Sequence, residues 1–297
     1  MRIGTHGRSL AIESIPSVHH IHELMRVHGM VPVVDKALAD QLAAAGLPLS
    51  ADTEVSPNPA AAGIDMFFSL GGDGTFLDSV SKVGHTGIPV LGINLGRLGF
   101  LSSTRVEGAE QAIRNVLRKN YTIEDRGLLV MKAAGMASMF ALNEVSVHKR
   151  DSSSMLAVHA YVDDRFLNTY WSDGLIVATP TGSTAYSLSC GGPLLDPTCD
   201  AMVITPIAPH NLNVRPIVLP GSSVIRLSAE ARGDKYLVNL DSHSIALDHA
   251  TDLHIQRADH RVRFVHLPGH DFFNTLRDKL AWGLDVRSKP PSGALAE

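Results

Sequence analysis

The chain has 297 residues, of which 44% are hydrophobic and 19% are charged. This length allows two domains with cores of their own, and the composition is typical of globular rather than disordered proteins. The formal net charge is -4, from 30 acidic and 26 basic residues. This balance argues against non-specific binding to nucleic acid or to an anionic membrane surface, so we expect neither partner.

Signals for localisation and for metal binding are few. Cys190 and Cys199 match no common zinc spacing and no disulfide framework. The first residues lack the apolar stretch of a signal peptide, and no apolar run is long enough to span a membrane. We therefore expect a cytoplasmic protein. His19, His20 and His22 share an expected helix. The spacing of His19 and His22 could hold a metal, but no third ligand is evident, so a solvated helix face is the favoured interpretation.

Strands and helices alternate up to about residue 120. Strands are expected at residues 2–5, 30–34, 66–70 and 89–93, and helices at 18–25, 37–45, 75–82 and 107–120. Residues 50–63, rich in Pro, Ala and Asn, are expected to form a loop. This alternation predicts a Rossmann-like α/β domain with a parallel sheet.

The pattern then changes to strands separated by turn signals. They are expected at residues 126–132, 137–149, 155–163, 165–171, 174–179, 223–232, 235–240, 253–257 and 261–266, with one short helix near 184–190. This series predicts a β-sandwich-like domain. Phe272, Leu276 and Leu280 return to helical spacing, and this last helix is expected to pack on the first domain. The expected domains are residues 1–122 with 271–287, and 123–270, followed by a disordered tail at 288–297.

The first chemical motif is Gly71-Gly72-Asp73-Gly74-Thr75, between an apolar strand and an expected helix. Glycines let a backbone approach a ligand closely, and exposed amides at a helix N-terminus bind phosphate. Asp73 would repel phosphate, so a base or an indirect metal contact is the better hypothesis for its carboxylate. The alternative is an ordinary tight turn.

The second motif runs from Asp173 to Pro193 as strand, turn, short helix and Gly-Gly-Pro. It contains six hydroxyls in nine residues, on Thr181, Ser183, Thr184, Tyr186, Ser187 and Ser189. So many hydroxyls favour a site for a polar ligand with a ring, with Tyr186 as a stacking face and Asp173 as a hydrogen-bond acceptor. The alternative is a helix capped by Ser183 or Thr184.

The third motif is Asn143-Glu144, inside the expected strand at 137–149. Alternation explains one polar residue there but not two neighbours, and a carboxylate beside an amide suits paired sugar hydroxyls. An edge strand or a bulge is the alternative.

Together these motifs resemble the NAD kinase family, which uses ATP to phosphorylate NAD on its adenosine ribose. The stretch from Gly92 to Leu101 matches as well, and weaker matches occur at residues 209–216, Asp241-Ser242 and 273–276. The resemblance covers most of residues 64–282 and implies an α/β domain, a β domain and a last helix that returns to the first domain. It also implies a homodimer or homotetramer.

The resemblance also implies roles for individual residues. Asp73 is expected to be the catalytic base that takes the proton of the ribose hydroxyl. Gly71, Gly72, Gly74 and Thr75 are expected to hold the ATP phosphates, with Mg²⁺ bound mostly through phosphate and water and without a cage of protein side chains. The expected NAD-binding residues are Asp73, Gly74, Asn143, Glu144, Asp173, Thr184, Ala185, Tyr186, Ser187, Leu188, Ser189, Ala208 and His243.

Two departures from the family pattern limit these expectations. Trp171 stands where many relatives have Arg or Lys, so Arg97, Arg215 or a neighbouring subunit is expected to compensate charge. His243 stands where many relatives have Gln. The alternatives to an NAD kinase are a lipid or sugar kinase with a similar glycine turn and a non-catalytic nucleotide-binding protein.

Overall fold

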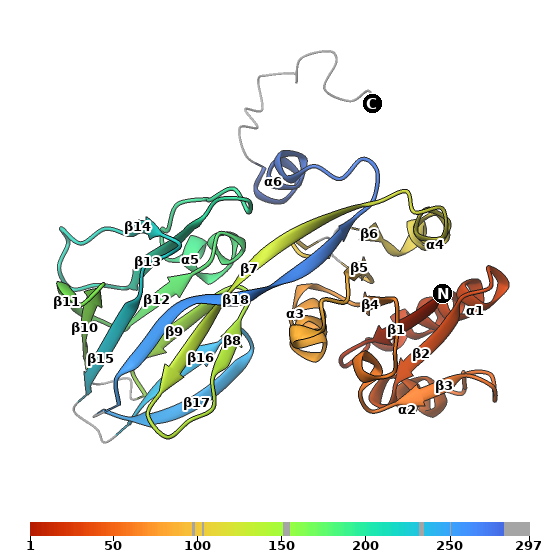
Figure 1. Cartoon of the computed structure of the whole chain (residues 1–297), viewed down its shortest axis with the longest axis horizontal. Helices are drawn as coiled ribbons and strands as arrows, with labels where there is room; N and C mark the ends of the chain where they lie inside the picture. The colour runs from red at the N-terminus through yellow and green to blue at the C-terminus, as the bar shows by residue number, and fades with distance from the viewer. Residues whose placement is uncertain (97–98, 103, 151–154, 232–234, 250, 282–297) are drawn as a thin grey trace, which may run out of the picture. The chain divides into compact units, whose positions relative to one another are not determined.

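The computed structural model describes residues 1–96, 99–102, 104–150, 155–231, 235–249 and 251–281 (Figure 1). The described chain forms two compact units, the first from residues 1–124 and 263–281, the second from 125–262. The chain leaves the first unit within β7 (Thr122–Ala133) and returns within β18 (Leu253–His266). This return comes earlier than residue 270, where the sequence led us to expect it, because Phe264 already pairs with Val90 of β5. The expected tail at 288–297 lies outside the described residues.

A parallel sheet forms the centre of the first unit, with the strand order β5-β4-β1-β2-β3. Its strands are β1 (Arg2–His6), β2 (Val31–Asp35), β3 (Glu54–Ser56), β4 (Met66–Leu70) and β5 (Val90–Asn94). The short β6 (Thr104–Arg105) and the end of β18 also pair with β5. The parallel α/β prediction is confirmed, although β3 lies inside the stretch expected to be a loop.

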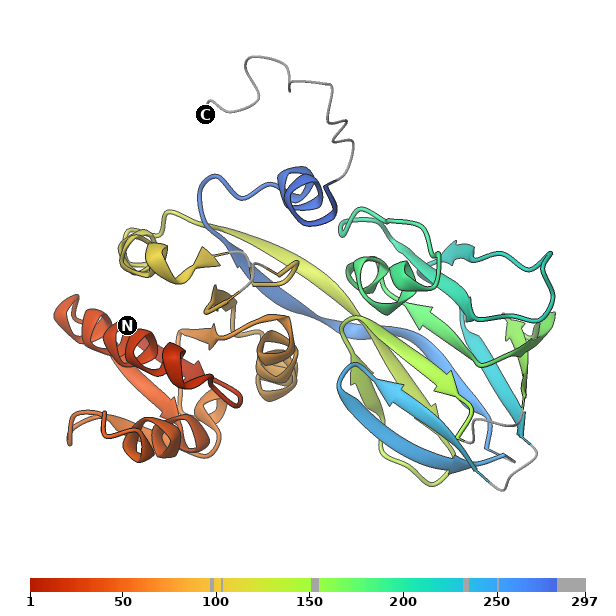
Figure 2. The same ribbon diagram turned by 180° about the vertical axis from the view of Figure 1, so that it is seen from behind.

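The first unit has five described α-helices, three of which share one core with the sheet. The helices are α1 (Ile15–Val27), α2 (Lys36–Ala44), α3 (Asp73–Val83), α4 (Ala109–Leu117) and α6 (Phe272–Leu280). Met25 of α1, Leu38 of α2 and Ile113 of α4 pack in the same cluster as Phe68 of β4, and α1 and α4 are neighbours (Figure 2). Burial of such a side chain contributes about 1.5–3 kcal/mol.

Short 3-10 turns and caps define the ends of several elements. The turns are η1 (Ile12–Ser14), η2 (Pro59–Ala61), η3 (Gly84–Thr86), η4 (Val106–Gly108) and η5 (Thr181–Thr184). The Asp35 carboxylate accepts the amide of Ala37 at 3.0 Å and caps α2. Asp271 caps α6 in the same way, which explains why the last helix begins there.

The second unit contains two antiparallel sheets. One has the order β11-β10-β15-β18, with β7 paired to β18 and β8 paired to β7, and the other has the order β14-β13-β12-β9-β16-β17. The strands are β8 (Met139–Ala141), β9 (Glu144–His148), β10 (Leu156–Val162), β11 (Arg165–Ser172), β12 (Gly174–Ala178), β13 (Ala201–Ile207), β14 (Ile217–Pro220), β15 (Ile225–Ala231), β16 (Lys235–Leu240) and β17 (His243–Asp248).

One core joins the two sheets of this unit. Val158 and Leu227 enter it from one sheet, and Val147, Val177 and Tyr236 enter it from the other. This arrangement confirms the sandwich-like prediction. The helix expected near 184–190 is α5 (Tyr186–Ser189).

Three parts of the β prediction were wrong. The strands β13, β14 and β17 were not predicted, and Pro206 within β13 is a residue that normally argues against a strand. The two strands expected at 253–257 and 261–266 are one strand, β18. The strand expected at 137–149 is two strands, β8 and β9, which belong to different sheets.

One of the three helical histidines differs from the expected solvated face, whereas His20 is exposed. His22 is buried rather than solvated, with its Nδ1 at 2.8 Å from the Val18 carbonyl and its Nε2 at 2.9 Å from the Thr5 hydroxyl. Burial lowers the pKa of His22 to about 4. His22 is therefore a neutral core residue. No helix among the described residues is long and apolar enough to cross a membrane.

Candidate functional site

The glycine turn follows the fully buried strand β4 and opens helix α3. The Gly71 amide donates to the Ile93 carbonyl at 2.9 Å, and a Cβ at Gly71 would collide with the side chain of Thr75. By contrast, a Cβ at Gly72 or Gly74 would meet nothing within 4 Å. Gly72 is the N-cap of α3, and no described side chain caps this end. The first turn of α3 therefore offers backbone amides and open space to an anion.

Asp73 is the first residue of α3, and a nearby loop grips its carboxylate. Its Oδ2 accepts the amide of Phe100 at 2.8 Å, and its Oδ1 accepts the amides of Leu101 and Ser102, both at 3.1 Å. A Cβ at Gly99 would collide with this carboxylate, so only glycine lets the loop approach so closely. Three amide donors fix the position of the Asp73 side chain.

For the stretch from Gly92 to Leu101 the sequence suggested a role only for Arg97, and its described residues help to build this loop. The Asn94 side-chain amide donates to the Ser102 carbonyl at 3.3 Å, and its oxygen accepts the Gly96 amide at 2.8 Å. The Ser102 hydroxyl donates to the Gly71 carbonyl at 3.3 Å. The sequence signal was the series of glycines, which the tight turn requires. Arg97 lies outside the described residues.

In the second unit, the motif Asn143-Glu144 marks the break between β8 and β9. The Asp241 carboxylate accepts three successive amides at this break, from Leu142 at 2.7 Å, Asn143 at 2.8 Å and Glu144 at 3.1 Å. The two adjacent polar residues therefore mark the end of one strand and the start of the next, rather than the middle of a single strand. The sequence showed Asp241 only as a weak match and did not predict this contact.

Glu144 is the most perturbed carboxyl group of the described site. It is 8% exposed, and its Oε2 has no hydrogen-bond partner among the described residues. Burial, with a smaller effect of the Asp241 charge, raises the pKa of Glu144 to about 8. Burial also raises the pKa of Asp241, against the three amides that lower it. A buried, unpartnered carboxyl group is costly for folding and is typical of a ligand site.

Asp173 has a cationic partner that the sequence analysis missed. The Nζ of Lys149 lies 2.5 Å from the Asp173 Oδ1. Lys149 follows β9 directly, and its amide donates to the Asp173 carbonyl at 3.0 Å. Lys149 thus brings positive charge to the neighbourhood of Trp171. Arg215, one of the expected substitutes, instead donates to the carbonyls of Leu212 and Val214 in its own loop.

Tyr186 presents a partly exposed ring that stacks on a neighbouring imidazole. Its ring is stacked on the imidazole of His148, with centroids 5.8 Å apart and an interplanar angle of 16°. The side chain of Tyr186 is 39% exposed. Burial raises the pKa of its hydroxyl, with smaller contributions from neighbours that include Asp173 and Glu144. The stack therefore lies in the field of both carboxyl groups.

The hydroxyls of the Asp173 to Pro193 motif serve mostly the fold of the segment. The Ser183 hydroxyl donates to the Pro180 carbonyl at 2.6 Å, and that of Thr184 to the Thr181 carbonyl at 3.1 Å. The Ser187 and Thr205 hydroxyls are 2.8 Å apart. Neither Ser183 nor Thr184 caps α5, whose N-cap is Ala185. The number of hydroxyls was thus a weaker argument for a polar ligand than the sequence indicated.

Family models of the two ATP-NAD kinase domains cover most of the chain. The ATP-NAD kinase N-terminal domain matches residues 16–121, and the ATP-NAD kinase C-terminal domain matches residues 142–267. The chain belongs to the NAD kinase family. An NAD kinase of Cytophaga hutchinsonii is 40% identical over 293 residues, which are 97% of this chain and 100% of that protein. An NAD kinase of Bacteroides fragilis is 48% identical over 226 residues, which are 75% of this chain and 78% of that protein.

Two solved structures of NAD(H) kinases are similar to this one. Yeast NADH kinase complexed with NADH has a TM-score of 0.86 and 24% identity, over 98% of this chain and 90% of that chain. An NAD kinase from Archaeoglobus fulgidus in complex with ATP has a TM-score of 0.74 and 25% identity, over 95% of this chain and 99% of that chain. The yeast likeness shows the shared fold alone.

Two of the residues expected to bind NAD, Ala208 and His243, lie at chain turns of the second unit. Ala208 follows β13 at a φ of 44°, a strained value for alanine, and the Asp173 amide donates to the carbonyl of the preceding Ile207 at 3.0 Å. Ala208 therefore lies beside Asp173. His243 is exposed at the start of β17, two residues after Asp241.

Proposed function

We propose that this NAD kinase-family chain transfers the γ-phosphoryl group of ATP to the 2′-hydroxyl of the adenosine ribose of NAD, giving NADP and ADP. It is thus a phosphotransferase with an alcohol acceptor. The observation that carries the proposal is the position of Asp73, a carboxylate held by three amides at an open, glycine-lined helix N-terminus. Such a helix end binds phosphate, and such a carboxylate can take a proton beside it.

Asp73 acts as the general base in this proposal. A carboxylate has about four acceptor positions. Oδ1 accepts two amides and Oδ2 accepts one, so Oδ2 keeps a position for the ribose hydroxyl. As Asp73 takes this proton, the ribose oxygen bonds to the γ-phosphorus, and the bond to the bridging oxygen of ADP breaks.

The open amides at Gly72, Gly74 and Thr75 would bind the ATP phosphates. Gly71 would contribute differently from our expectation, because its amide already serves the sheet and only its missing side chain makes room. Mg²⁺ would arrive with ATP, held by phosphate oxygens and water, as is usual for this ion beside nucleotide phosphates.

The second unit would hold NAD. Asn143 and Glu144 would bind ribose hydroxyls, because the unpartnered Oε2 of Glu144 needs a hydrogen-bond partner. Asp173 would accept a hydrogen bond from the base or a sugar, and Tyr186 would stack on a ring. The remaining contacts would come from Thr184, Ala185, Ser187, Leu188, Ser189, Ala208 and His243, with Ser187 acting through its backbone since its hydroxyl is engaged by Thr205.

One assay tests this function. Purified protein is supplied with Mg²⁺, with NAD or NADH, and with ATP, another nucleoside triphosphate or polyphosphate, and NADP(H) is measured. We expect NADP together with one equivalent of ADP. Absence of NADP(H) with every donor would reject the proposal, and phosphorylation of a lipid or a sugar instead would favour the alternative kinase.

We also propose that the chain forms a homodimer or homotetramer. Strand β11 is an edge strand, and it exposes 60% of Phe166 and 51% of Trp171. Exposed aromatic side chains on an unpaired edge favour association. Light scattering after gel filtration should give a multiple of 31.8 kDa, and a Trp171→Lys variant should shift it toward the monomer. A wild-type monomer at micromolar concentration would reject this proposal.

A further inference from the structure

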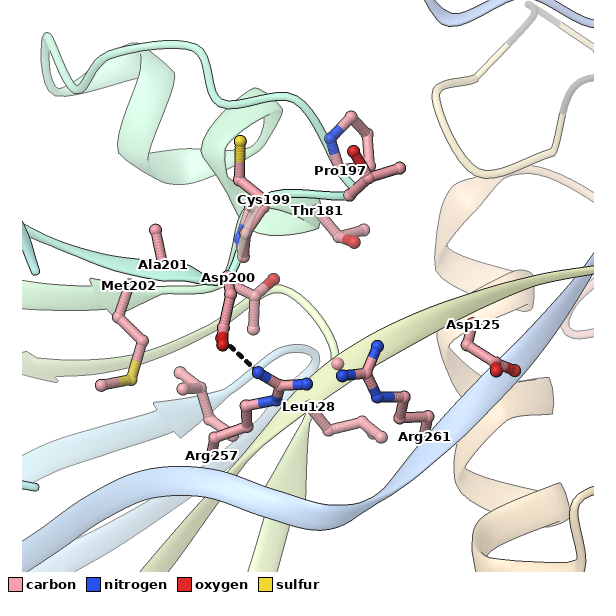
Figure 3. A pocket seen from close by; sticks show the side chains of 15 residues that line it. Asp125, Leu128, Thr181, Pro197, Cys199, Asp200, Ala201, Met202, Arg257 and Arg261 are labelled. Carbon is pink, nitrogen blue, oxygen red and sulfur yellow. Dashed lines mark hydrogen bonds and ion pairs between the residues drawn. The ribbon is translucent and has the colours of Figure 1, made fainter. Parts of the chain in front are cut away.

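One pocket lies entirely within the second unit, and its lining contains none of the residues assigned to NAD (Figure 3). It lies between β7, β18 and residues 197–202, which lead into β13, and part of its space is open to solvent. Leu128, Met202 and Pro180 give it apolar walls.

Two arginines from β18 project into this pocket (Figure 3). Arg257 forms an ion pair with Asp200. Arg261 is exposed and makes no hydrogen bond or ion pair within the part of the chain that the structure describes. The pocket therefore holds one guanidinium that is neutralised and a neighbouring one that is not.

A third guanidinium lies behind the wall of the pocket. Arg126 is 5% exposed, and its Nη1 donates to the Thr181 hydroxyl, which lines the pocket, at 3.2 Å. Against these three positive charges the lining contains two carboxylates, Asp125 and Asp200. Like charges repel more strongly between apolar walls than in water, so an anion bound there would relieve the repulsion.

We propose that this pocket binds the phosphate groups of a nucleotide. A guanidinium presents parallel N–H donors that match two oxygens of one phosphate, and Arg261 has all of its donors available. The shared chemistry is a di- or triphosphate, which comes either from the phosphoryl donor or from a nucleotide bound as an effector. Thr181 begins η5, which leads directly to Tyr186, so an anion here would also act on the NAD-binding segment.

Calorimetry with inorganic pyrophosphate tests the pocket without reference to turnover. We expect wild type to bind pyrophosphate, Arg261→Gln to bind at least about tenfold more weakly, as for loss of a charge-assisted contact, and Arg261→Lys to recover part of the affinity. Arg165→Gln, an exposed arginine of β11 outside the pocket, is the matched control and should bind as wild type. Equal binding by Arg261→Gln and wild type, or no binding at all, would overturn the proposal.

Kinetics then identify the source of the phosphate, and this step rests on the proposed function. A raised KM for ATP in Arg261→Gln, with the KM for NAD unchanged, identifies the donor. Loss of inhibition by added pyrophosphate or NADP, with both KM values unchanged, identifies an effector. Wild-type turnover in the same preparation tests the proposed function separately. A protein that binds pyrophosphate through Arg261 but has no kinase activity would reject the proposed function and leave the phosphate pocket standing.

Discussion

Replacement of Glu144 by glutamine should make the protein more stable at neutral and alkaline pH. Burial raises the pKa of Glu144 from 4.5 to about 8 in the folded protein. The unfolded chain therefore releases a proton from this group between these pH values while the folded protein keeps it, and stability falls as the pH rises through this range. Since one pH unit corresponds to about 1.4 kcal/mol, the cost at pH 7 is about 3 kcal/mol. The glutamine of Glu144→Gln has no proton to release, so this variant should not lose this stability.

Urea unfolding at pH 5 and pH 8, followed by circular dichroism, measures this difference. We expect the two proteins to differ little at pH 5 and Glu144→Gln to be more stable by about 3 kcal/mol or more at pH 8. Glu107→Gln, at an exposed glutamate of the first unit, is the control and should follow wild type. Parallel pH dependences for wild type and Glu144→Gln would show that Glu144 is ionised in the fold and would refute the reasoning.

Three further predictions follow from other described contacts. Asp73→Ala should lower kcat by at least about 100-fold, the usual loss for a general base, with an unchanged circular dichroism spectrum; unchanged turnover would remove Asp73 from catalysis. His148→Ala should raise the KM for NAD more than the KM for ATP, because it removes the ring that stacks on Tyr186. His148→Phe keeps such a ring and should have a KM for NAD close to that of wild type. A larger effect on the KM for ATP would place Tyr186 at the site of the phosphoryl donor. As the pH falls from 6.5 to 4, wild type should lose about 3 kcal/mol of stability relative to His22→Gln, because unfolded His22 takes up a proton that the folded protein excludes, and urea titrations of both proteins at the two pH values measure this difference.

The sequence was most informative where a local pattern decides the structure. The apolar run of β4 and the three glycines after it predicted a buried strand, a turn and a helix, and the structure has them. Helical spacing likewise predicted α1 and α6. The glycine turn also singled out Asp73, whose carboxylate accepts three amides.

The sequence was least informative about contacts between distant segments. Nothing near Asp241 in the chain indicates that its carboxylate holds residues 142–144, nor that Lys149 meets Asp173. The break between β8 and β9 was hidden because both halves are apolar and each continues as a strand. The hydroxyls after Thr179 were misjudged for a related reason, since side chains that bind their own backbone cannot be distinguished by type from those that wait for a ligand.

Asp73 and Asp241 share one arrangement, a carboxylate that clamps three successive amides from a distant part of the chain. Asp73 spans 27 to 29 residues, and Asp241 spans 97 to 99. Each set of amides is therefore a built-in reporter that hydrogen–deuterium exchange can follow without a label. A ligand that draws either carboxylate away should speed exchange at residues 100–102 or 142–144, and one that tightens the clamp should slow it. The two reporters distinguish events at the two units in a single measurement.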